Sequence, residues 1–152
     1  MIHEEYIDKA VVALEQNGAA TEQFFVENQE DFVQYLNEEL FKVFTEEEAQ
    51  LLLFLLTVIH QAHHIQYGET ITVDLDAFNK SDDNNWKQRE SCKNWTQAKD
   101  AFFDNTVQED ALAFVEDMLA DDDEDKIVIS DAVEEIIFIT AKSFIDTITA
   151  TS

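Results

Sequence analysis

The chain of 152 residues contains no proline and only two glycines, Gly18 and Gly68. Proline interrupts a helix because it lacks the amide hydrogen and its ring collides with the preceding turn. Glycine commonly ends helices because it adopts the left-handed conformation at low cost. With so few of either residue the chain can hold long helices, and we expect helix ends near Asn17-Gly18 and at Gly68. A chain of this length predicts a single domain, residues 1–152.

Apolar residues recur at helical spacing along most of the chain. Ile7, Val11 and Leu14 follow the i, i+4, i+7 pattern of one helix face. A further helix is predicted at 46–66, and its middle, residues 51–59, is apolar on every side, which is typical of a helix buried all round. We therefore predict a mainly α single-domain bundle of six or seven helices packed around this buried central helix.

Two short segments have the pattern of strands. Residues 71–75 alternate apolar and polar side chains, and residues 127–129 are Ile-Val-Ile. Two strands alone are marginally stable in water. We expect that they can pair as a small two-stranded element that lies on the helices.

The chain has 34 Asp and Glu against nine Lys and Arg, a net charge of −25. Residues 1–50 hold thirteen acids and two bases (−11), residues 51–100 seven and five (−2), and residues 101–152 fourteen and two (−12). Such a field favours cationic partners. It argues against direct binding of nucleic acid, which requires clustered Lys and Arg to neutralise phosphates.

Two runs of acidic residues are the predicted partner-binding sites. The first follows Thr45, with which it forms a capping box, and the second lies between two predicted elements. The candidate residues are Glu46, Glu47, Glu48, Asp121, Asp122, Asp123, Glu124 and Asp125. The second run begins like a calcium loop but has Lys126 and Ala132 where Gly and Glu are required, so weak divalent cation binding is the most it indicates.

A second, less acidic contact surface is a hypothesis for residues 80–99. This stretch holds five of the nine basic residues and both tryptophans, and Trp and Arg are favoured at interfaces. Its candidate residues are Trp86, Arg89 and Trp95. The alternative, which we favour, is that these bases neutralise the acidic ends within the fold.

Three of the four histidines, His60, His63 and His64, lie near the end of the central helix. On a helix, His60 and His64 project from one face at a spacing that can hold a transition metal. No third ligand is evident, and a structural role near the negative end of the helix is the favoured interpretation. No cofactor is indicated.

Cellular location is indicated by features that are absent from the sequence. Cys92 is the single cysteine, so no intramolecular disulfide can form and a reducing compartment is expected. The first residues do not have the pattern of a signal peptide, and the run 51–59 is too short to span a bilayer. We expect a soluble, cytoplasmic protein without membrane contact; the oligomeric state is open.

The charge leads to a functional hypothesis, because no pattern in the chain indicates catalysis. We favour a non-enzymatic acidic protein that engages a basic protein. Immunity proteins of nuclease toxins and DNA-mimic inhibitors work in this way, and the analogy rests on charge alone. One alternative is a metal- or small-ligand-binding protein or enzyme centred on His60, His63 and His64. Another is that the charge serves solubility or adaptation to a saline environment.

Overall fold

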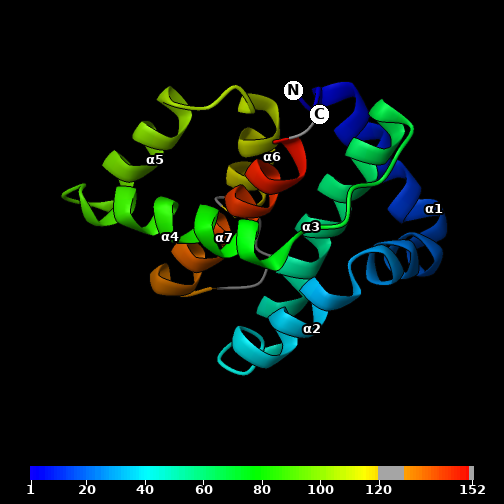
Figure 1. The fold of residues 1–152 in the computed structure, drawn as a ribbon, viewed down its shortest axis with the longest axis horizontal. Coiled ribbons are helices and arrows are strands. Elements are labelled where there is room, and N and C mark those ends of the chain that lie inside the picture. Colours follow the sequence, from blue (N-terminus) through cyan, green and yellow to red (C-terminus); the bar gives the residue numbers. More distant parts are fainter. Residues whose placement is uncertain (120–128, 151–152) are drawn as a thin grey trace.

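The computed structural model describes residues 1–119 and 129–150, and these form seven α-helices without a strand (Figure 1). The prediction of a mainly α bundle is confirmed. In chain order the helices are α1 (Glu4–Asn28), α2 (Glu30–Glu39), α3 (Glu46–Tyr67), α4 (Leu75–Glu90), α5 (Trp95–Asp104), α6 (Glu109–Leu119) and α7 (Asp131–Thr149).

Helix α3 is the central element, as predicted. It begins with the capping box, in which the Thr45 hydroxyl accepts a hydrogen bond from the Glu48 amide and the Glu48 carboxylate accepts one from the Thr45 amide. It ends at Gly68, whose φ of 73° is the left-handed conformation that favours glycine. Between these ends, residues such as Leu55 and Ile59 are completely buried. Figure 1 shows α3 between α1 on one side and α7 on the other.

Helix α1 bends where the sequence predicted an end. Asn17 has non-helical angles (φ −142°, ψ 54°), yet the helix resumes after it and continues to Asn28. The Thr21 hydroxyl donates to the Asn17 carbonyl at 2.9 Å, which gives the carbonyl near the bend a partner. The pair Asn17-Gly18 therefore interrupts α1 without ending it.

The prediction of a strand over 71–75 is wrong. The start of this segment runs extended over the core, and its backbone pairs with a side chain instead of another strand: Gln29 Nε2 donates to the Ile71 carbonyl (2.6 Å), and Gln29 Oε1 accepts from the Val73 amide (2.8 Å). Apolar and polar side chains alternate in this segment because one of its sides faces the core, where Val73 is buried. Of the other predicted strand, 127–129, the first two residues lie outside the described part and Ile129 is not in a strand.

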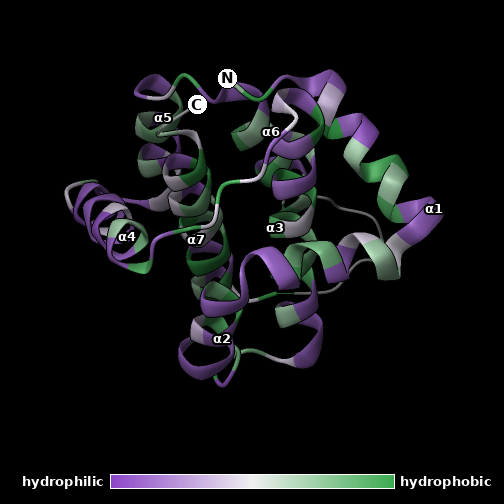
Figure 2. Ribbon diagram, turned by 45° about the vertical axis from the view of Figure 1, so that its right-hand side comes forward, coloured by the Kyte–Doolittle hydropathy of each residue, from purple (hydrophilic) through white to green (hydrophobic). Residues whose placement is uncertain are grey.

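The second buried helix is α7, which packs against α4, α3 and α6. Aromatic rings join it to the surrounding helices: Phe144 stacks on Phe32 of α2 at 5.3 Å, and Phe32 meets Phe78 of α4 edge to face at 4.8 Å. In Figure 2 the hydrophobic residues, in green, gather on α3 and α7, while α2 and α4 are largely hydrophilic. Most acidic residues of the described helices lie on the helices around this pair, although α3 begins with Glu46, Glu47 and Glu48, and α7 also carries four acids.

Candidate functional site

An acidic groove lies between the first half of α1 and helix α6. We call it the α1–α6 groove, and its volume is about 210 Å³. Both helices contribute carboxylates to its rim and apolar side chains to its floor. The rim residues are Glu4, Asp8, Asp110 and Asp117, and the floor residues are Ile7, Ala113 and Phe114. The groove therefore offers negative charge beside an apolar surface.

The groove joins the two acidic ends of the sequence in space. Glu4 and Asp8 belong to the first fifty residues, and Asp110 and Asp117 to the last fifty-two. Among the described residues, no basic side chain lines the groove, and none of these four carboxylates forms an ion pair. Of the four, only Asp110 accepts a hydrogen bond from another described residue, from the Glu4 amide at 3.0 Å. The rim therefore keeps most of its capacity to pair with an added cation.

A second acidic depression lies on the other side of α6. Asp100, Phe103 and Asp104 of α5 border it together with Glu116 of α6, and it is open, with a volume of about 480 Å³. Glu116 also pairs with Lys99 at 3.7 Å. Helix α6 thus carries carboxylates into both depressions, and the one toward α1 is the more enclosed and the less neutralised.

The predicted partner-binding residues fall into three groups. Glu46 and Glu47 are exposed at the start of α3. Glu48 is only 7% exposed, and its carboxylate is bonded within the capping box, so it serves the helix end. Asp121, Asp122, Asp123, Glu124 and Asp125 lie outside the described residues.

The predicted second surface is largely used in packing. Arg89 forms an ion pair with Glu135 of α7 and lies 6.0 Å from the Trp95 ring. Trp95 in turn meets Phe138 edge to face at 5.2 Å, and Trp86 is half-buried against the core. These contacts tie α4 and α5 to α7, while Lys80, Lys87 and Lys93 are exposed.

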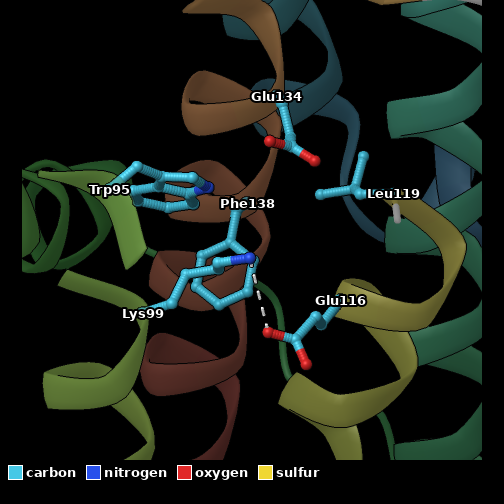
Figure 3. A pocket seen from close by; sticks show the side chains of 6 residues that line it. All are labelled: Trp95, Lys99, Glu116, Leu119, Glu134 and Phe138. Carbon is cyan, nitrogen blue, oxygen red and sulfur yellow. Dashed lines mark ion pairs between the residues drawn. The ribbon is translucent and has the colours of Figure 1, made fainter. Parts of the chain in front are cut away.

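A small pocket lies beside Trp95. Figure 3 shows it between Trp95 and Lys99 of α5, Glu116 and Leu119 of α6, and Glu134 and Phe138 of α7, with the Lys99–Glu116 pair at its edge. Its volume is about 10 Å³. A space of this size holds no more than about one water molecule. It is therefore not a binding site for a small organic ligand.

The histidine cluster lies inside the protein. His60 and His63 are 3% and 2% exposed, and His64 is half-buried. Phe24 of α1 contacts the rings of both His60 and His64, at 5.4 and 4.9 Å between centroids. Within residues 1–119 and 129–150, no three His, Cys, Asp or Glu side chains are placed to hold a metal ion. The surroundings of these histidines are those of core residues.

The buried position of His60 changes its acid–base behaviour. Desolvation, reinforced by His64 and His63, lowers the pKa of His60 from 6.5 to about 4. Desolvation also lowers the pKa of His63, against the opposing effect of Glu69. Both rings are therefore neutral near pH 7, and neither ring nitrogen of His60 has a hydrogen-bond partner among residues 1–119 and 129–150.

A buried polar network between α4 and α7 was not predicted from the sequence. Asn85, which is 5% exposed, donates to the Ser143 hydroxyl at 2.9 Å and accepts from Lys142 Nζ at 3.2 Å. Lys142 also pairs with Asp146 at 2.7 Å, and the Ser143 hydroxyl lies 3.2 Å from Asp82 Oδ1. In the sequence, residues 81–90 form a polar stretch, and the otherwise apolar helix α7 contains a short polar run. Nothing in the sequence indicates that these two stretches face each other, because this depends on the packing of α4 on α7.

Burial raises the pKa of one carboxyl in this network. The pKa of Asp82 is raised from 3.8 to about 6, chiefly by desolvation; the hydrogen bond with Ser143 opposes this rise, and the nearby Asp83 adds to it. Ser143 is completely buried, so it is inaccessible to a substrate. The network holds α4 and α7 together.

No described helix has both the length and the apolar character needed to cross a bilayer. No protein-family model matches the chain, and comparison with curated proteins and with solved structures found no similar protein. The α1–α6 groove is therefore the candidate site on geometric and electrostatic grounds alone.

Proposed function

We propose that this protein is a non-enzymatic binding protein whose acidic surface engages a basic protein. The observation that carries this proposal is the α1–α6 groove, where four carboxylates surround an apolar floor without a basic side chain among them. A Lys or Arg side chain combines a cationic end with an apolar stem. It can place the cation at the rim and the stem on Ile7 and Phe114.

The more specific form of the proposal is inhibition in the manner of an immunity protein or a DNA mimic. Carboxylates on helices create a negative field, as the phosphates of DNA do. The basic surface of a nuclease or DNA-binding protein is attracted to such a field. Electrostatic attraction of this kind accelerates association and weakens as salt is added. The net charge of −25 and the placement of acids on both sides of α6 support this form.

The test is binding of a synthetic lysine-rich peptide, with a neutral peptide of equal length as the reference. Its affinity is measured by calorimetry at low and at high salt. The groove variant carries Glu4→Gln, Asp8→Asn and Asp117→Asn. The matched control removes the same charge from exposed positions elsewhere, as Glu15→Gln, Glu22→Gln and Glu90→Gln.

We expect the groove variant to lose at least about tenfold in affinity, and the control variant to lose much less, because the control changes only the distant field. Equal losses in the two variants would show attraction by net charge without a site, and would contradict the proposal. Absence of binding even at low salt would contradict it as well. A melting temperature that rises steeply with KCl in the same samples, without peptide binding, would favour environmental adaptation as the origin of the charge.

A further inference from the structure

The second half of α1, residues 18–28, is held on α3 by aromatic rings packed around His60. Phe24 and Phe25 lie 5.4 and 5.3 Å from the His60 ring, between centroids. Phe24 also meets His64 edge to face at 4.9 Å. The His60 ring is thus enclosed mainly by apolar groups, and neither of its nitrogens has a hydrogen-bond partner.

Protonation of His60 is costly in these surroundings. A neutral imidazole has one N–H group, and protonation adds a second N–H and a positive charge. A buried charge without an acceptor or a counter-charge costs several kcal/mol in general. At His60 no acceptor is present for either N–H group, so acid is opposed by the packing itself.

The groups that face His60 offer no compensating negative charge. On α3 its ionisable neighbours are His63 and His64, which disfavour its protonation. From α1 the contacts are the rings of Phe24 and Phe25, while the acids of this half, Glu22 and Glu27, are exposed. From α7, Phe144 contacts the Phe25 ring at 6.1 Å between centroids, and the ionisable Lys142 and Asp146 bond each other and Asn85. Glu69 and the N-terminal amine act on His63 instead.

The segment 18–28 is bounded by two breaks in the helical backbone. Asn17 precedes it with φ −142° and ψ 54°, and Gln29 follows it with φ −122° and ψ 37°. Gly18 has no neighbouring atom within 4 Å of where a Cβ would lie, so the chain is not crowded at the first break. The two breaks allow the segment to move as a unit once two sets of hydrogen bonds are broken: those of the Thr21 hydroxyl to the Ala13 and Asn17 carbonyls, and that of Thr70 to Asn28.

We propose that mild acid detaches residues 18–28 of α1 from α3, with Asn17 and Gln29 as the hinge residues, while the rest of the bundle stays folded. This inference goes beyond the proposed function and does not depend on it. Detachment removes the rings of Phe24 and Phe25 from the histidines and lets water reach them. It leaves the α1–α6 groove, which belongs to the first half of α1, in place.

The size of the effect follows from linkage. The pKa of His60 is about 4 in the closed protein and 6.5 when the ring is solvated. Since the open state binds the proton more tightly, the opening equilibrium constant rises as the pH falls below 6.5. At pH 5 it is expected to be about thirtyfold larger than at pH 7.5.

The experiment is amide hydrogen exchange of the whole chain, followed by mass spectrometry, at about pH 7.5 and pH 5 and corrected for the intrinsic exchange rate. In the wild type we expect residues 18–28 to lose about thirtyfold in protection at pH 5. Peptides from α4 and α7 should keep theirs. His60→Leu removes the titrating group and should abolish the loss, and His60→Gln serves if the first variant does not fold.

The control variant is His3→Gln, which removes an exposed histidine and should show the wild-type response. Three results would overturn the proposal: unchanged protection of residues 18–28 in the wild type, the same loss in both His60 variants, or a simultaneous loss in every helix. An NMR titration of the wild type in which His60 titrates near 6.5 with the segment still protected would overturn it too.

Discussion

The α1–α3 and α4–α7 interfaces both bury polar side chains, yet only the second satisfies their hydrogen bonds. At α1–α3, His60 is 3% exposed and neither of its ring nitrogens has a partner. At α4–α7, Asn85 is 5% exposed and bonds Ser143, Lys142 and Asp146. A buried polar group that lacks a partner costs about 1–3 kcal/mol relative to a bonded one. Burial of a polar side chain is therefore costly at His60, and at Asn85 the hydrogen bonds offset this cost.

The two interfaces also respond to acid in opposite directions. The pKa of His60 is lowered, so its contribution to stability is complete above pH 6.5 and is lost as the pH falls toward 4. The pKa of Asp82 is raised, so its ionised form destabilises the fold above pH 6, and protonation removes this cost as the pH falls from about 6 toward 3.8. Acid weakens the first interface and strengthens the second.

The largest expected effect on stability is that of Asn85→Ala. The change leaves Ser143 and Lys142 without their shared partner and opens a small cavity between α4 and α7. We expect the free energy of unfolding at neutral pH to fall by about 3 kcal/mol. Urea denaturation measures it, and Asn84→Ala, at the exposed neighbouring position, is the control with an expected change below about 0.5 kcal/mol. If the two variants lowered the free energy of unfolding equally, the hydrogen bonds of Asn85 would not stabilise the α4–α7 interface, and the contrast with α1–α3 would be wrong.

An intermediate effect is expected for Asp82→Asn. The amide keeps an oxygen that can accept from Ser143 and removes the buried charge. After allowance for its partial exposure to solvent, we expect a gain in stability of about 1 kcal/mol at pH 7.5, which disappears below about pH 4, where Asp82 itself is neutral. Denaturation series at both pH values test this, with Glu90→Gln as the exposed control. A gain that is the same at both pH values would show that the charge is not its cause.

The smallest effect at neutral pH is expected for His60→Leu. The variant loses a buried ring without hydrogen bonds and keeps an apolar side chain, so the two changes nearly offset each other, and stability should stay within about 1 kcal/mol of the wild type. Urea denaturation at pH 7.5 measures the change beside that of Asn85→Ala. A loss as large as that of Asn85→Ala would mean that His60 forms hydrogen bonds in solution that the packing does not show.

Local sequence patterns predicted the helix ends well where the residues of the helix itself determine where it begins and ends. The capping box at Thr45 and the stop at Gly68 both lie where the sequence placed them. The same reasoning failed at 71–75, because an extended segment against a core has the alternation of a strand. What distinguishes the two is the partner of the backbone, and here that partner is the side chain of Gln29, 42 residues before Ile71. Two residues so far apart in the chain leave no pattern in the local sequence that would reveal their contact.

The sequence indicated the acidic character of the candidate site but not its place in the fold. The charge of the two ends indicated an acidic binding surface, and the groove contains acids of both ends, yet Glu4, Asp8, Asp110 and Asp117 were not singled out. They stand apart in the sequence and form no run. The runs that drew attention proved less informative: Glu48 is bonded in a helix cap, and Asp121–Asp125 lie outside the described residues.

The sequence by itself determined that this chain is a helical bundle with α3 at its centre, since helix limits and buried faces follow from neighbours three or four residues apart. It also determined the net charge of −25, which is a sum over residues and does not depend on their arrangement. Only the tertiary structure decided which carboxylates share a groove and which buried polar groups find partners. Both depend on how helices pack across the chain, and side-chain spacing along one helix carries no information about that.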